Sequence, residues 1–144
     1  MPFFNNEMKG FISNIEQDAI ANENFRKVLY TAKHCQLVLM SLLPNEEIGD
    51  EVHTLDQFFR IESGEGKVVI DGVETLIADG SAIIVPEGAR HNVINTSADK
   101  SLKLYTIYSP ANHRDGVIHL TKVEAEADEG PDGEHFDGKT SEDF

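Results

Sequence analysis

Four side chains in the middle of the chain have the chemistry of metal ligands. Glu51, His53 and Gln57 stand two or four positions apart, and a β-strand places such positions on one face. They offer a carboxylate oxygen, an imidazole nitrogen and an amide oxygen. His91 opens a later apolar run and can add a second imidazole from a neighbouring strand. Two histidines and one carboxylate suit a divalent first-row metal, such as Fe, Mn, Ni, Co or Zn.

Each of these residues also has an ordinary interpretation. His53 and His91 could be hydrogen-bonded histidines that bind no metal, and Glu51 could be an exposed acid at the start of a strand. Gln57 could hydrogen-bond to His53 and orient its ring instead of binding the ion itself. Both roles of Gln57 remain open at this point.

Further candidates come from the tyrosines and the remaining histidines. Tyr105 and Tyr108 lie on opposite faces of the last long apolar run, so at most one of them faces a pocket. Tyr108 is the catalytic candidate, although its even-numbered apolar neighbours make a core position the alternative. The other histidines show no ligand spacing and are interpreted as surface residues, the middle two being possible lid residues: His34, His113, His119 and His135.

Short strands must position these side chains. Between residues 25 and 109, runs rich in valine, isoleucine, leucine, threonine and aromatic residues alternate with turn residues, and helical periodicity is absent. The predicted strands span 25–31, 35–43, 51–62, 66–71, 73–78, 82–85, 90–96 and 102–109. Asp71-Gly72, between two apolar runs, is the strongest hairpin signal. Many short strands and few helices predict an all-β sandwich or barrel, for which a jelly roll is one solution.

Three parts of the chain differ in composition. Residues 1–24 form an N-terminal arm with a short helical segment, for which Asn14 is the predicted cap. Residues 25–120 contain all the predicted strands. Residues 121–144 form an acidic tail with nine acidic residues and two lysines, which accounts for half of the formal charge of −14. We expect the acidic tail to be solvated and mobile. The alternative is that it is pinned across the barrel by Val123, His135 and Phe136.

The segment from residue 80 to residue 95 carries a second kind of signal. Glycine, proline, glycine, histidine and asparagine follow one another with the separations G-x5-P-x-G-x2-H-x3-N. The positions are Gly80, Pro86, Gly88, His91 and Asn95. This pattern resembles the second motif of the cupin family, in which the glycines and the proline make the turn that delivers the histidine.

The first cupin motif, G-x5-H-x-H-x3,4-E-x6-G, is met in part. His53 and Gly64 match it, whereas Glu51 stands at the first histidine and Gln57 at the glutamate. Asn45 stands at the leading glycine. The resemblance covers roughly residues 35–109 and is to small single-domain microbial cupins of the mannose-6-phosphate isomerase-like type.

The resemblance implies a double-stranded β-helix, or jelly-roll barrel, that holds a metal through Glu51, His53, Gln57 and His91. The implied function is a metal-dependent enzyme acting on a small polar organic molecule, of isomerase or epimerase, lyase or dioxygenase type. In such an enzyme the ion acts as a Lewis acid, and Glu51 could serve as the base. The alternatives are a non-catalytic cupin that binds a small ligand and a metal-stabilised structural protein.

Composition limits the partners. A net charge of −14 with twelve scattered basic residues argues against binding to nucleic acid or to an anionic membrane. No apolar run has the length of a membrane span, the N-terminus lacks a signal-peptide pattern, and Cys35 has no partner cysteine, so we expect a cytoplasmic protein. Phe58 is predicted on the outer face of its strand, so we expect either a further strand or a second subunit to cover it, and a homodimer is the expected partner arrangement.

Overall fold

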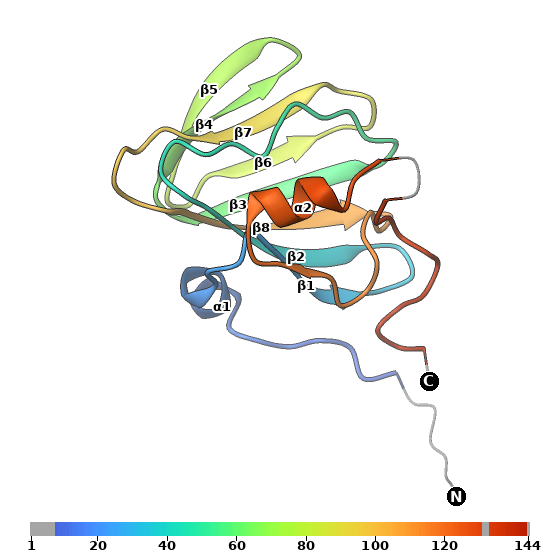
Figure 1. Ribbon diagram of the computed structural model, residues 1–144. Coiled ribbons are helices and arrows are strands. Elements are labelled where there is room, and N and C mark those ends of the chain that lie inside the picture. The colour runs from blue at the N-terminus through green and yellow to red at the C-terminus, as the bar shows by residue number, and fades with distance from the viewer. Residues whose placement is uncertain (1–7, 131–132, 144) are drawn as a thin grey trace, which may run out of the picture.

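Strands dominate the structure, a computed structural model that describes residues 8–130 and 133–143. They form a six-stranded sheet in the order β6-β3-β8-β2-β1-β9 and a three-stranded sheet in the order β5-β4-β7. The bounds are β1 (Arg26–Thr31), β2 (Gln36–Leu42), β3 (Asp56–Ser63), β4 (Glu65–Ile70), β5 (Val73–Ala78), β6 (Ala82–Val85), β7 (His91–Asn95), β8 (Leu102–Ser109) and β9 (Ile118–His119). All the pairings are antiparallel. The predicted all-β jelly roll is confirmed (Figure 1).

Most of the predicted strands agree with the structure to within one residue at each end. The Asp71-Gly72 hairpin is confirmed: both residues have positive φ, 46° and 84°, as the tight turn between β4 and β5 requires. Two predictions were wrong. The run 51–62 becomes a strand only at Asp56, and β9 was missed because two residues carry no recognisable pattern.

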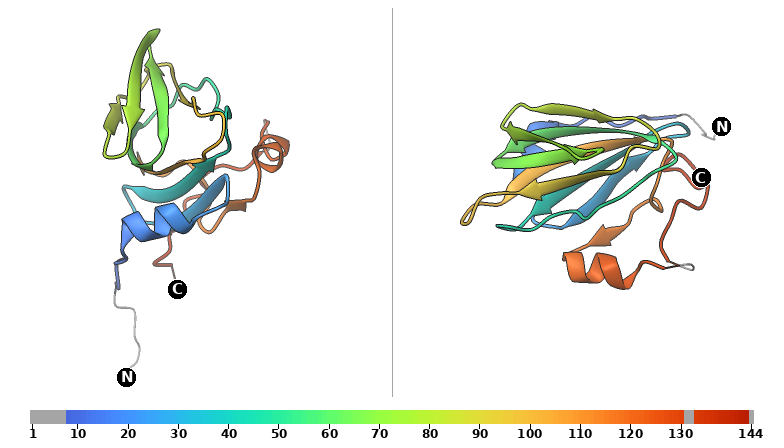
Figure 2. Two further views of the ribbon diagram at one scale, coloured as in Figure 1. Left: turned by 90° about the vertical axis from the view of Figure 1, so that its left-hand side faces the viewer. Right: turned by 90° about the horizontal axis from the view of Figure 1, so that it is seen from above.

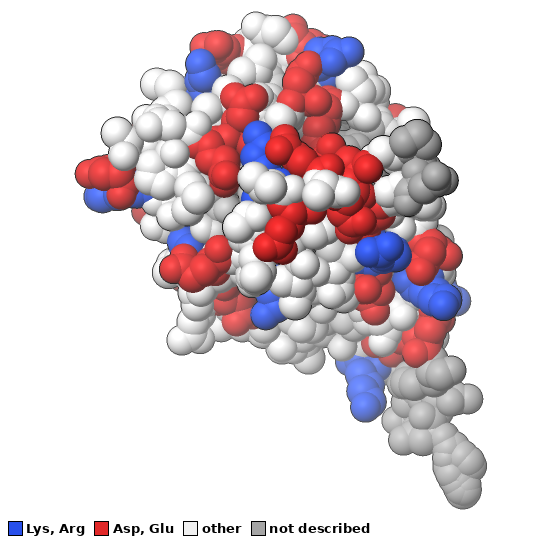
Figure 3. All heavy atoms as spheres, viewed as in Figure 1, with Lys and Arg blue, Asp and Glu red and all other residues white. Residues whose placement is uncertain are grey.

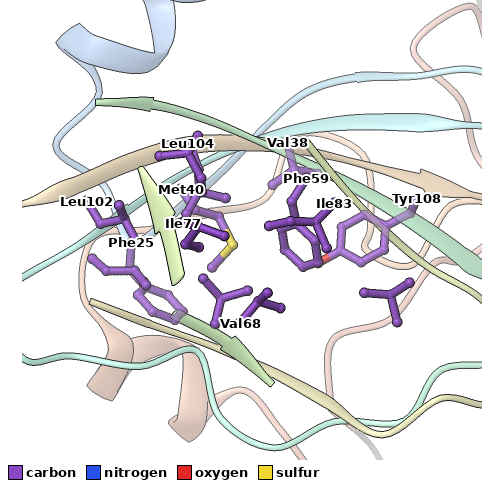
Figure 4. Packing of buried hydrophobic residues seen from close by; sticks show 14 of the residues in the cluster. Phe25, Val38, Met40, Phe59, Val68, Ile77, Ile83, Leu102, Leu104 and Tyr108 are labelled. Carbon is purple, nitrogen blue, oxygen red and sulfur yellow. The ribbon is translucent and has the colours of Figure 1, made fainter. Parts of the chain in front are cut away.

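The two sheets face each other, and the core lies between them (Figure 2). Alternate residues of β2, β3 and β8 point into it, among them Met40, Phe59 and Leu104, all at most 1% exposed. Each such side chain contributes roughly 1.5–3 kcal/mol when it is fully removed from water. Phe59, Ile83 and Tyr108 lie together in one part of this core (Figure 4).

Helix α1 (Ile15–Ala21) confirms the predicted helical segment of the N-terminal arm. The side chain of Asn14 accepts a hydrogen bond from the backbone N–H of Gln17 at 3.0 Å, as a capping residue does. Ala19 is its one buried side chain, and it faces the six-stranded sheet. The helix therefore covers part of that sheet.

The acidic tail lies against the barrel, so the prediction of a mobile tail is wrong for its described residues. It begins with α2 (Lys122–Ala127) and continues as irregular chain (Figures 1 and 2). Backbone hydrogen bonds of 2.9 Å join Phe136 to Asn112 and Ser141 to Thr31. Of the three expected anchors, Val123 is 74% exposed and His135 is exposed, whereas Phe136 is half-buried. Polar contacts hold the segment, and composition does not reveal those.

Acidic side chains gather over α2 and the segment that follows it, as the tail's composition requires (Figure 3). The same view shows only scattered Lys and Arg side chains, with no basic stripe on this face. Among the described residues, no helix is both long enough and apolar enough to cross a bilayer.

Candidate metal centre

The backbone brings Glu51 and His91 together without the strand that the sequence predicted. Glu51 precedes β3 and forms an isolated bridge with His91, in which each N–H donates to the other's carbonyl at 2.9 Å. The carbonyl of His53 accepts a hydrogen bond from the N–H of Gly88, also at 2.9 Å. Gly88 has φ of +87°, a conformation that favours glycine. The turn at Gly88, in the second motif, is thus hydrogen-bonded to the segment at His53, in the first motif.

The side chains of Glu51, His53 and His91 converge. Each offers one ligand atom, and these atoms all lie within 4.8 Å of one another. Nε2 of His53 is 3.3 Å from Oε1 of Glu51, and the two imidazole rings are 5.3 Å apart between centroids. Three of the four predicted ligands therefore surround one point.

The imidazole of His91 has the tautomer that a metal ligand needs. Its Nδ1 lies 3.0 Å from the carbonyl oxygen of Ala89, and because a carbonyl only accepts, Nδ1 carries the proton. Nε2 is left with a free lone pair. A hydrogen bond of this kind commonly fixes the orientation of metal-bound histidines.

Buried atoms without partners test whether a metal fits. Among the described residues, Nε2 of His53, Nε2 of His91 and Oε1 of Gln57 are buried and accept or donate no hydrogen bond. The 3.3 Å approach of His53 to Glu51 is a contact without hydrogen-bond geometry. Leaving such groups unpaired is costly, and a cation bound between them would satisfy them. The donor set fits a divalent metal.

Gln57 is 2% exposed and lies in β3. Its amide nitrogen donates to Oγ1 of Thr106 at 3.0 Å, which fixes the amide so that its oxygen is the free end. No hydrogen bond joins Gln57 to His53 in the described part of the chain. The hydrogen bond to His53 that the sequence left open is therefore not made, and the amide oxygen of Gln57 is without a partner in the described part of the chain.

Tyr108 belongs to the core and also borders the site. It is 2% exposed, and its ring meets that of His53 edge to face at 5.9 Å. Its hydroxyl lies 3.3 Å from Nε2 of His113. Burial raises the pKa of Tyr108 above its ordinary value, so the hydroxyl keeps its proton. Tyr105 is half-buried beside Phe58 on the outer face, as parity predicted.

The carboxylate of Glu51 is ionised at neutral pH. Burial raises its pKa, but the opposing effects of His53, Arg26 and His91 are larger together and hold the pKa below the ordinary value. An ionised carboxylate beside two free imidazole nitrogens is suited to bind a cation.

A cavity of about 250 Å³ opens onto Glu51, and we name it the Arg26–Glu51 pocket. Barrel and acidic tail both line it, through Arg26, Glu51, Asn112, His113, Ala125, Asp128, Glu129, Gly130 and Glu134. This wall could not be predicted from the sequence, because residues so distant along the chain share no motif. His113 and His119 were predicted at the surface, and this was wrong, since each is 6% exposed. The acidic tail covers them.

Comparison with known proteins decides the family. Residues 38–108, the span that contains all four predicted ligands, match the family model described as "Cupin domain". The chain belongs to the cupin family. A similar protein of known structure is BH2720 from Bacillus halodurans, with 41% identity and a TM-score of 0.80, covering 83% of this chain and 95% of that one.

Two further relatives match this cupin along most of its length. The uncharacterized protein YrkC of Bacillus subtilis strain 168 is 46% identical over 84% of this chain and 68% of its own. The uncharacterized protein L612 of Acanthamoeba polyphaga mimivirus is 38% identical over 83% of this chain and 78% of its own. Both matches extend beyond the span of the domain model.

Proposed function

We propose that this cupin is a metal-dependent enzyme that acts on a small polar organic molecule. Glu51, His53 and His91 would hold the ion, with the amide oxygen of Gln57 as a further donor. The observation that carries the proposal is the convergence of two unpartnered imidazole nitrogens and an ionised carboxylate on one point. The reaction types that suit the family resemblance are isomerisation or epimerisation, elimination by a lyase, and dioxygenation.

A divalent metal supplies Lewis acidity toward a substrate oxygen when it is bound. The protein's own residues would do the rest. Tyr108 keeps the proton on its buried hydroxyl at the edge of the site and can donate a hydrogen bond to a substrate oxygen. Glu51 is ionised and borders the pocket, so its carboxylate can accept a proton when it does not bind the ion.

The Arg26–Glu51 pocket favours an open site over a purely structural one. A structural metal is closed off by its protein ligands, whereas a catalytic metal keeps a position for water or substrate. Here the pocket reaches Glu51, whose side chain is 31% exposed. A non-catalytic binding protein would have the same access, and turnover of a bound ligand distinguishes the two.

Metal analysis and relaxation measurements test the proposal. Protein purified without chelator should contain one first-row metal per chain by elemental analysis. Reloaded with Mn²⁺, it should enhance water proton relaxation, because water exchanges at an open position. Stoichiometric metal without this enhancement would support the structural alternative, and protein without metal affinity would refute the proposal.

A further inference from the structure

Arg26 is a buried cation that the metal site does not explain. It opens β1, is 6% exposed and lines the Arg26–Glu51 pocket. Its Nη1 lies 3.1 Å from Nδ1 of His119, and Nε2 of the same imidazole lies 3.1 Å from Oδ2 of Asp128. The guanidinium only donates and the carboxylate only accepts, so His119 is neutral, with its proton on Nε2. Arg26 therefore bonds to a neutral ring.

The guanidinium has no carboxylate partner of its own. Among the described residues, no Asp or Glu oxygen lies within ion-pair distance of Arg26, although five other lysine and arginine side chains have one. Its Nε is buried and makes no hydrogen bond. The charge of Arg26 lowers the pKa of Glu51 and Glu134 without a direct ion pair to either. A buried guanidinium without a direct ion pair is unfavourable, so this arrangement indicates an anion that comes from outside the chain.

The acidic residues of the pocket are engaged elsewhere. Glu134 accepts hydrogen bonds from His113 and from the backbone N–H of Arg114, both at 2.7 Å. Asp128 accepts from His119, and Glu51 faces the two imidazoles of the metal centre. Glu129 is exposed to solvent at the rim. None of the four neutralises the guanidinium directly.

We propose that Arg26 binds the carboxylate group of a small organic acid in the Arg26–Glu51 pocket. This substrate class deepens the proposed function and rests on it, because the rest of the acid would then lie beside the metal ligands. Guanidinium is the side chain best matched to a carboxylate, which it can bind through two parallel hydrogen bonds. The neighbouring amide of Asn112 is a further polar group on the same wall.

The size and charge of the pocket limit the acid. At about 250 Å³ it is below the roughly 300–1,000 Å³ of pockets for drug-sized ligands. The pocket is therefore the right size for a small acid with few non-hydrogen atoms. A phosphate group would carry more charge into a pocket where four acidic residues accompany Arg26, so a carboxylate is favoured.

Calorimetric titration with two probes of equal size tests this. Glycolate carries a carboxylate, and glycolamide replaces it with a neutral amide. Full-length wild type should bind glycolate at least tenfold more tightly, both metal-loaded and metal-free. Arg26→Met should lose at least tenfold in glycolate affinity while keeping its metal content, and Arg26→Lys should lose less. Arg60→Met, a change of the same kind on the outer face of β3, should leave both affinities unchanged.

Equal binding of the two probes by wild type would overturn the inference, as would wild-type glycolate affinity in a folded Arg26→Met variant. Tighter binding of inorganic phosphate than of glycolate would overturn the assignment to carboxylates. Circular dichroism would show whether Arg26→Met folds. If it does not, the comparison of glycolate with glycolamide on wild type still tests the inference. Wild type that binds no metal but prefers glycolate would refute the proposed function and support the anion site.

Discussion

Nδ1 of His113 lies 2.7 Å from Oε1 of Glu134, and both side chains are less than 10% exposed. Burial lowers the pKa of His113 despite the carboxylate beside it, so the imidazole is neutral. Burial raises the pKa of Glu134, but the hydrogen bond from His113 and the neighbouring positive charge outweigh this effect. The net pKa is below the ordinary value, so the carboxylate is ionised. A neutral imidazole thus donates to an anion. This bond fastens the acidic tail to the wall of the pocket.

Glu134→Ala should destabilise the protein, because it leaves the buried N–H of His113 without an acceptor. An unsatisfied buried donor costs about 1–3 kcal/mol, and we expect a loss of that size in the free energy of unfolding. Urea denaturation measures it. Glu126→Ala, an exposed site on α2, is the matched control and should change stability by less than about 0.5 kcal/mol. Equal stability of the two variants would mean that the bond does not hold the tail.

Acid should weaken the fold through the same pair. The pKa of folded His113 is below the ordinary value of 6.5, so the unfolded chain takes up this proton first as the pH falls. Stability is therefore lost below about pH 6.5, and the lowered pKa of Glu134 extends the loss below its ordinary 4.5. Urea denaturation at a series of pH values from about 8 to about 5 would measure how the free energy of unfolding changes with pH. The change should fall in this range because histidines titrate there.

A histidine substitution isolates the cause of that slope. His113→Gln should flatten the dependence between these limits, whereas His135→Gln, at an exposed position, should leave it as in wild type. A wild-type slope in His113→Gln would assign the acid sensitivity to other groups.

Gln57→Ala should weaken metal binding without abolishing it. A neutral amide oxygen is a poorer donor than the imidazoles and carboxylate beside it, and losing a supporting partner typically lowers metal affinity by about 10–100-fold. Gln57→Glu adds a charge at the same place and should bind metal more tightly than wild type. Competition with a metal-sensing dye measures both. Complete loss of metal from Gln57→Ala would make the amide an indispensable ligand.

The homodimer expected from Phe58 stays a prediction, and the outer face of the six-stranded sheet suggests how to test it. Phe58 is half-buried and stands in register with Ile84 on one side and Ile107 on the other. Ile84 is 71% exposed. Light scattering after size exclusion should give a dimer for wild type and a smaller mass for Ile84→Asp. Val73→Asp, on an exposed strand of the other sheet, is the control. A monomeric wild type would reject the dimer.

Features that depend on interactions between residues close together in the sequence could be predicted. The Asp71-Gly72 hairpin was predictable because its turn needs two adjacent positive φ angles, and the cap at Asn14 because it acts within three residues. The convergence of Glu51 and His91 was anticipated, although through a strand that does not exist there.

Arg26, His113 and Glu134 could not be found in the same way. Their contacts span up to 93 residues, and no periodicity marks them. Composition also misled, since the acidic tail has the charge of a mobile segment but docks through individual hydrogen bonds. Arginine is usually exposed, so the burial of Arg26 could be recognised only once the fold was known.

The metal content of two histidine variants tests the central claim most directly. His53→Ala and His91→Ala, with His135→Ala as the exposed control, should be purified without chelator and measured by elemental analysis beside wild type. If the site is as described, wild type and His135→Ala hold one equivalent of a first-row metal, and the other two hold none. Unchanged metal content in folded His53→Ala and His91→Ala would contradict it.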